Sequence, residues 1–116
     1  MKSEHVEQRE FVQWVRQWTP YRIFAIPNGG SRSGFQGAKL KAEGVSAGVP
    51  DLCIPALLMW VEMKRADGTV TAVQRDWHVY LRSIGHVAVV AYSKEQAQQA
   101  VTLAMLPAVP EKREPR

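Results

Sequence analysis

Residues 50–64 read PDLCIPALLMWVEMK, in which two short apolar runs flank a bend at Pro55. Residues 51–54 and 59–64 have the composition of β-strands. Proline lacks a backbone donor and is therefore typical of a bend rather than a strand interior. The pattern predicts a β-hairpin near the centre of the fold.

One end of this hairpin carries charged side chains. Residues two apart on a strand point to the same face, so Glu62 and Lys64 project together while Met63 faces the core. Asp51 starts the partner strand and is expected to lie across from Glu62. Two close carboxylates repel unless a proton or a cation sits between them. Their hard oxygen atoms suit Mg²⁺ or Mn²⁺, so the pattern favours metal-assisted hydrolysis of a phosphodiester.

A simpler interpretation exists for each of these residues. Glu62 and Lys64 would also form a weak ion pair on a solvated strand face, and aspartate is a common turn residue after proline. Glu-x-Lys occurs often by chance, so alone it favours this simpler interpretation. Pro50-Asp51 upstream and the glycine-rich basic segment before it favour a catalytic site.

The residues before the hairpin predict a helix, a strand and a long loop. Residues 4–18 form the helix, with Ser3 as N-cap and Phe11, Val15 and Trp18 on one face. Residues 21–26 form the strand, which ends at the turn sequence PNGG, residues 27–30. Residues 27–50 contain six of the eight glycines, and residues 37–43 are expected to form a helical turn or two.

This loop also carries cations. Glycines let backbone approach phosphates, so its basic side chains favour DNA contact over a purely solubilising role. The loop is not a P-loop, because no Gly-Lys-Ser/Thr follows at the required spacing. The cations are Arg32, Lys39 and Lys41.

The second half of the chain predicts two helices around a strand. Thr71 and Gln74 form a capping box that opens a helix ended by Gly85. Its expected apolar stripe consists of Val73, Trp77, Tyr80, Leu81 and Ile84. Residues 86–92 are expected to form a central buried strand. A second capping box, Ser93 to Gln96, opens a final helix to about Met105.

The element order is therefore α-β-β-β-α-β-α, which defines an α/β fold with a mixed sheet flanked by helices. Residues 1–106 are expected to form a single domain, and residues 107–116 a flexible tail.

Composition adds few constraints. The net charge of +4 favours an anionic partner only slightly. The single cysteine, Cys53, excludes an internal disulfide and a cysteine-rich zinc site, which favours an intracellular, cytoplasmic protein. The longest apolar run, residues 52–61, is shorter than the roughly 20 residues of a membrane span. No signal peptide is visible, and His5, His78 and His86 share no metal-ligand spacing.

The Pro-Asp…Glu-x-Lys arrangement resembles the PD-(D/E)xK nuclease superfamily. More narrowly, the chain resembles the virus-type replication repair nuclease (VRR-NUC) family, and in particular its small stand-alone phage and bacterial members. The matching motifs run in the family's order from Glu4 to about Ala100. They are Glu4-His5-x-x-Gln8, Ile26-Pro27-Asn28-Gly29, residues 39–45 (KLKAEGV), residues 48–52 (GVPDL), Glu62-Met63-Lys64 and Gln74-x-x-Trp77.

This resemblance implies a restriction-endonuclease-like core and a set of site residues. It implies that Asp51, Glu62 and the backbone carbonyl of Met63 bind Mg²⁺, for which Mn²⁺ would substitute, and that Lys64 assists the attacking water. A glutamate of the first helix also joins the site in this family, as a further catalytic and metal-binding residue. Glu4 matches by its spacing to Gln8, while Glu7 lies on the same helical face and remains the alternative.

Further residues follow from the same resemblance. Gln74 matches a glutamine near the active-site lysine, although its capping-box geometry accounts for it equally well. Asn28 joins the three loop cations as a DNA-binding candidate.

The expected activity is that of a Mg²⁺-dependent endodeoxyribonuclease acting on structured DNA, such as a Holliday junction. The resemblance also implies a homodimer in a bacterial or phage-infected cell, weakly supported by the apolar run at residues 57–60. The alternatives are a nuclease of other specificity, such as flap cutting or nicking, and a non-catalytic DNA-binding module.

Overall fold

The computed structural model describes residues 2–27 and 34–107. Along this part of the chain the elements follow the predicted order, and the helical turn or two expected at residues 37–43 is a full helix, α2, that begins earlier. The elements are α1 (Glu4–Trp18), β1 (Phe24–Ala25), α2 (Gly34–Ala42), β2 (Leu52–Ile54), the 3-10 turn η1 (Pro55–Leu57), β3 (Met59–Met63), α3 (Ala72–Ser83), β4 (Val87–Ala91) and α4 (Lys94–Met105).

The four strands form one mixed sheet in the order β1-β2-β3-β4. β2 pairs antiparallel with both β1 and β3, whereas β3 and β4 are parallel. The predicted hairpin is confirmed, with Leu52 opposite Val61 and Ile54 opposite Met59. Leu58 ends its turn in the left-handed conformation, with φ of 49°. The predicted mixed sheet flanked by helices is therefore correct.

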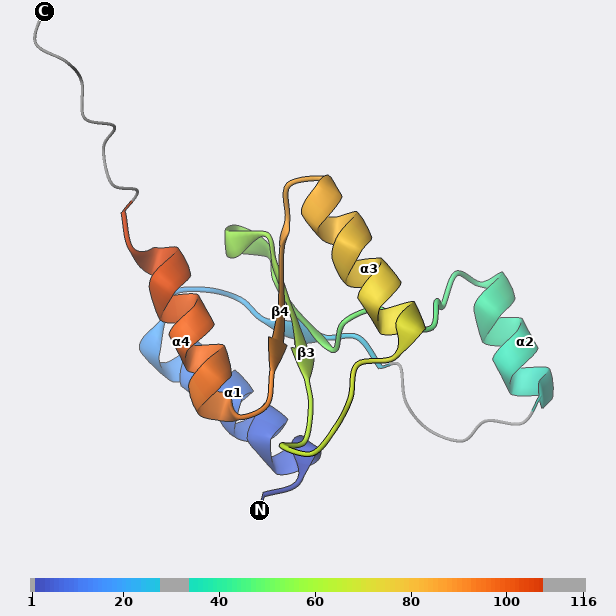
Figure 1. The fold of residues 1–116 in the computed structure, drawn as a ribbon, viewed down its shortest axis with the longest axis horizontal. Coiled ribbons are helices and arrows are strands. Elements are labelled where there is room, and N and C mark those ends of the chain that lie inside the picture. The colour runs from blue at the N-terminus through green and yellow to red at the C-terminus, as the bar shows by residue number, and fades with distance from the viewer. Residues whose placement is uncertain (1, 28–33, 108–116) are drawn as a thin grey trace, which may run out of the picture.

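Helices cover the sheet on both faces. In Figure 1, α1 and α4 lie together on one side of β3 and β4, and α3 lies on the other. The main apolar core fills the α1/α4 side. Alternate residues of β3 enter it, since Met59, Val61 and Met63 are all buried against Phe11 and Val15 of α1. The intervening residues of β3, Trp60 and Glu62, therefore point to the α3 side.

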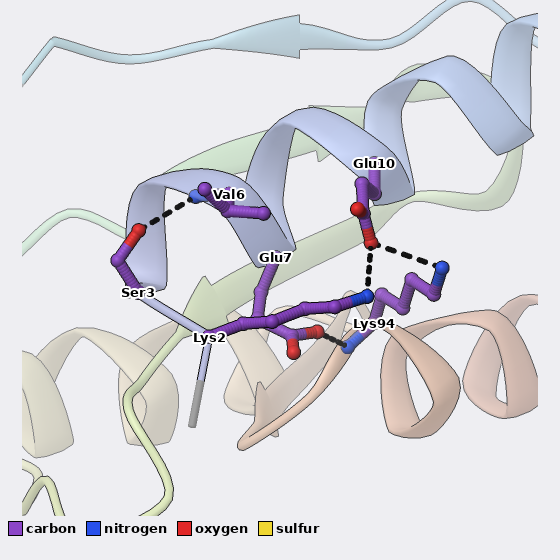
Figure 2. A network of polar contacts seen from close by, with 6 residues as sticks. All are labelled: Lys2, Ser3, Val6, Glu7, Glu10 and Lys94. Atoms are coloured by element: carbon purple, nitrogen blue, oxygen red, sulfur yellow. Dashed lines mark hydrogen bonds and ion pairs between the residues drawn. The ribbon is translucent and has the colours of Figure 1, made fainter.

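A polar network joins the starts of α1 and α4 (Figure 2). The Glu10 carboxylate accepts hydrogen bonds from the ammonium groups of Lys2, at 2.8 Å, and Lys94, at 2.9 Å. These bonds lower the pKa of the Glu10 carboxyl to about 2, and the bond to Lys2 is the largest cause. Glu7 accepts a hydrogen bond from the backbone N–H of Lys94, the first residue of α4, at 2.5 Å. Ser3 caps α1 as predicted. The network fixes the first turn of α1 beside the loop that leaves β4.

Two predictions about strands need correction. β4 is not central but at an edge of the sheet, next to the central strand β3. Its apolar composition reflects the helices on its two faces rather than strands on both sides. The strand predicted at residues 21–26 shrinks to two residues, because only Phe24 and Ala25 pair with β2.

The expected apolar stripe of α3 is only partly correct, because Leu81 is buried and Trp77 partly buried but the other three residues are not. Its buried residues are His78 and Leu81, whereas Val73, Tyr80 and Ile84 are about half exposed. The buried face is therefore rotated towards His78. In the same way Trp18, at the end of α1, is 69% exposed and does not join Phe11 and Val15 in the core.

Of the two predicted capping boxes, the one at α3 is complete and the one at α4 is only half formed. Thr71 and Gln74 form the reciprocal capping box as predicted. At α4, Ser93 accepts from the N–H of Gln96, but the Gln96 side chain accepts from Tyr92 instead of Ser93. The turn at residues 28–30 and tail residues 108–116 lie outside the described residues. None of the helices in the described ranges is long and apolar enough to cross a membrane.

Candidate active site

Asp51 and Glu62 come together at one end of the hairpin. The antiparallel register pairs Leu52 with Val61, so one residue further along, Asp51 faces Glu62 on the α3 side of the sheet. An Asp51 carboxylate oxygen also accepts a hydrogen bond of 2.7 Å from the backbone N–H of Met63. The predicted convergence of the two acids is therefore present in the structure.

Glu62 is a buried acid, with only 2% of its surface exposed. Burial raises the pKa of its carboxyl to about 9, assisted by a hydrogen bond to Asp51 and by the charges of Asp51 and Glu4, and opposed by Lys64. Its Oε1 atom is buried and has no hydrogen-bond partner among the described residues. A buried carboxyl beside a second acid either stays protonated or needs a bound cation to balance its negative charge.

Lys64 and the Met63 carbonyl lie at the same strand end. The ammonium of Lys64 is close enough to Glu62 to favour its charged form. The N–H and C=O of one residue in an extended strand point to the same neighbouring strand. Because the Met63 N–H bonds to Asp51, the Met63 carbonyl also faces the Asp51 side, whereas the next N–H, of Lys64, bonds to Ala91 on β4.

The structure distinguishes Glu4 from Glu7. Glu7 uses its carboxylate to cap α4 at the backbone of Lys94, as Figure 2 shows. The charge of Glu4 acts instead on Glu62. The spacing argument and the geometry therefore agree in favouring Glu4 as the acid of α1 beside the pair.

Gln74 lies in the first turn of α3, where its Oε1 accepts from the N–H of Thr71 at 2.9 Å. Its own N–H donates to the Thr71 hydroxyl at 3.2 Å. The observed contacts of Gln74 are thus those of a helix cap. Its side-chain NH₂ group takes no part in these two bonds.

The segment that carries Asp51 is held against α3, which sequence reasoning did not foresee. The indole N–H of Trp77 donates to the carbonyl of Ala47 at 3.0 Å. Gly48 has φ of +84°, and a Cβ atom there would lie 2.5 Å from the Val73 side chain and 2.8 Å from the Val73 backbone. Pro50 is fully buried. The sequence signals of this contact are Gly48 and Trp77, which both lie within the family-like motifs.

Two of the four predicted DNA-binding residues, Lys39 and Lys41, lie away from the acid pair. Lys39 and Lys41 are exposed in the last turn of α2, which in Figure 1 stands apart from the sheet beyond α3. Asn28 and Arg32 lie outside the described residues. The structure does not bring the lysines of α2 into contact with the acid pair.

The donor set suits a hard divalent cation that keeps much of its own water. Within residues 2–27 and 34–107, no three His, Cys, Asp or Glu side chains are grouped so as to hold a metal. The site offers two carboxylates and a backbone carbonyl on the same side, and one carboxylate oxygen has no partner among the described residues. Mg²⁺ is commonly bound through one or two carboxylates and retains several waters, so these residues fit it.

The fold and the acid pair together define a class of protein, an α/β domain with a Pro-Asp…Glu-x-Lys hairpin. No family model matches the sequence, and no curated protein matches it either. Among solved structures, the chain is similar to one described as a VRR_NUC domain protein. The TM-score is 0.70 with 25% sequence identity, over 87% of this chain and 86% of that one. This likeness supports the resemblance to the VRR-NUC family, with which the ordered motifs of the chain agree.

Proposed function

We propose that this protein is a Mg²⁺-dependent endonuclease that hydrolyses phosphodiester bonds in DNA. The likeness to a VRR_NUC domain protein supports a nuclease-like domain. The observation that carries the proposal is the buried Glu62 facing Asp51, with Lys64 on the same strand. A buried acid pair of this kind destabilises a fold unless it is protonated or binds a cation, and so indicates a functional role.

Each residue then has a distinct role. Asp51, Glu62 and the Met63 carbonyl would hold the metal, and Glu4 would add negative charge near it. The metal, when bound, supplies an activated water and neutralises charge on the phosphate. Lys64 orients that water or stabilises the extra negative charge on the phosphate in the transition state. The bond from the Met63 N–H helps to keep the Asp51 carboxylate in place.

Branched DNA is the proposed substrate, and a homodimer the proposed form. A two-fold dimer would present two equivalent sites to a four-way junction. The apolar run at residues 57–60 gives this less support than its sequence suggested, because Met59 is buried in the core and only Leu58 is about half exposed. The exposed Val73, Tyr80 and Ile84 of α3 offer a second apolar surface for a partner copy.

The decisive experiment is a cleavage assay with labelled four-way junctions, flaps and duplexes in Mg²⁺. We expect wild type to cut, and Glu62→Gln to be at least about a hundredfold slower while remaining folded. Calorimetric titration of Mg²⁺ or Mn²⁺ should show binding to wild type that Asp51→Asn abolishes. Equal cleavage by wild type and Glu62→Gln would end the proposal, and a preference for flaps or nicks would change only the substrate.

A further inference from the structure

A cavity of about 370 Å³ lies between α3 and β4, and its lining does not include Asp51 or Glu62. The loop before α3 contributes Thr69, and β4 and the residue after it contribute Val90 and Tyr92. Three basic residues of α3 complete the wall, namely Arg75, His78 and Arg82. They are spaced at i, i+3 and i+7, so they project from one face of the helix.

His78 is the unusual residue of this wall. It is 3% exposed, and both its ring nitrogens are buried without a hydrogen-bond partner in the described part of the chain. Burial, with a smaller effect of Arg82, lowers its pKa, so the ring is neutral near pH 7 and has one donor and one acceptor nitrogen. Buried polar groups are almost always satisfied, so an unpartnered imidazole at a cavity indicates a ligand or water.

The two arginines give the cavity its charge. A guanidinium nitrogen of Arg82 donates to the Ala88 carbonyl at 2.7 Å, and one of Arg75 reaches the Val70 carbonyl at 3.5 Å. Each guanidinium has five N–H donors, so most remain available to a ligand. No carboxylate is among the residues that line the cavity. Planar arginine forks beside a neutral donor suit a phosphate group.

The register of the sheet places this cavity beside the candidate active site. Val90 is the β4 partner of Glu62, and two residues further, just beyond the pair of Met63 and Ala91, Tyr92 aligns with Lys64. Both pairs lie on the α3 side of the sheet, and adjacent strands are about 4.8 Å apart. A phosphate in the cavity would therefore be a near neighbour of one held at the acid pair.

We propose that the cavity formed by Arg75, His78 and Arg82 binds a phosphate group of the DNA backbone next to the one that is cleaved. The DNA source of this phosphate depends on the proposed nuclease function, whereas phosphate binding itself does not. The site is a positioning subsite: it holds the substrate strand while Asp51, Glu62 and Lys64 act on the neighbouring phosphate.

The first test uses inorganic phosphate and the full chain without metal. Imidazole ¹⁵N resonances of His78 should shift on titration in wild type, and the apparent affinity should fall at least tenfold in Arg75→Gln/Arg82→Gln. Arg9→Gln/Arg16→Gln is a matched control. It also removes two exposed arginines that are seven positions apart on one helix, but this helix is α1. That control should titrate like wild type. Unmoved His78 resonances would overturn the proposal, since the cavity would then hold water or an adventitious ion only.

The second test identifies the source of the phosphate. In EDTA, Arg75→Gln/Arg82→Gln should bind a labelled branched DNA more weakly than wild type, whatever the DNA sequence. The slope of the logarithm of the binding constant against the logarithm of salt concentration should fall by about the amount that one phosphate contact contributes. Phosphate binding without any change in DNA affinity would overturn the DNA assignment in favour of a free phosphate or nucleotide. The nuclease proposal fails separately, through absence of cleavage in Mg²⁺, and neither binding result depends on that assay.

Discussion

The backbone N–H of Met63 donates a 2.7 Å hydrogen bond to the carboxylate of Asp51. This bond joins the residue that precedes β2 to the last residue of β3, beyond the last backbone pair of the hairpin. It holds Asp51 against Glu62 and aims the Met63 carbonyl to the same side. The oxygen atoms of the candidate metal site are thus arranged by the hairpin itself, before any ion binds.

The metal-free protein should lose stability as the pH rises. Glu62 has a pKa of about 9 in the folded state against an ordinary 4.5, so between these values the folded state holds a proton that the unfolded state has released. Its contribution to the free energy of unfolding therefore falls with pH across this window, by at most about 1.4 kcal/mol per pH unit for one proton. Melting temperatures in EDTA from pH 5 to 9 measure this slope.

Glu62→Gln is the control for that slope, because glutamine has a similar shape and cannot ionise. The variant should melt at nearly the wild-type temperature at pH 5 and at a higher temperature at pH 9. Parallel pH profiles for the two proteins would show that Glu62 is already ionised in the folded state.

Metal binding should release a proton. Near pH 7 the folded, metal-free pair retains the proton of Glu62, and a carboxylate must be deprotonated to act as a ligand. Calorimetric titration with Mn²⁺ in buffers of different ionisation enthalpy should report release of about one proton per ion at pH 7. In Glu62→Gln the enthalpy of any remaining binding should not depend on the buffer. A buffer-independent enthalpy in wild type would contradict this coupling.

The hairpin and its acids were predictable from sequence because their signals are local. Strand alternation put Glu62 and Lys64 on one face, and the bend at Pro55 placed Asp51 opposite. The burial of His78 and the edge position of β4 were not predictable in this way. The burial of His78 depends on which face of α3 meets the sheet, and a histidine between Trp77 and Val79 carries no periodic signal of burial. The edge position of β4 depends on the strand order, which pairing between distant segments decides. The polar contacts of Glu7 and Lys94 join residues 87 positions apart and were equally hidden.

Glu4 and Glu7 should separate stability from activity. Glu7→Ala removes the acceptor that caps α4, which should lower the free energy of unfolding by about 1 to 2 kcal/mol. Cleavage per folded molecule should change little. Glu4→Ala should instead slow cleavage, because it removes negative charge that would help to hold the metal beside Glu62. The free energy of unfolding measured in urea should change by less than about 0.5 kcal/mol. The reverse pattern would make Glu7 the acid of the site.

Gly48→Ala should damage the site from a distance. The added Cβ would lie 2.5 Å from the Val73 side chain and 2.8 Å from its backbone, and alanine disfavours φ of +84°. Either the start of α3 or the loop that carries Asp51 must then move. We expect a loss of more than about 1 kcal/mol of stability together with weaker Mn²⁺ binding.

Trp77→Phe is the milder variant of the same contact. It keeps an aromatic ring on α3 but removes the N–H that bonds to the Ala47 carbonyl, at a cost of about 1 kcal/mol. Since this loop leads into Pro50 and Asp51, Mn²⁺ affinity should fall in both variants, and more in Gly48→Ala.

Gly85→Ala is the control, because Gly85 also has positive φ, at +89°, but a Cβ there meets no atom within 4 Å. Gly85→Ala should therefore reduce stability through backbone strain alone and leave Mn²⁺ affinity unchanged. Equal loss of Mn²⁺ affinity in Gly48→Ala and Gly85→Ala would mean that general destabilisation, rather than displacement of Asp51, is responsible.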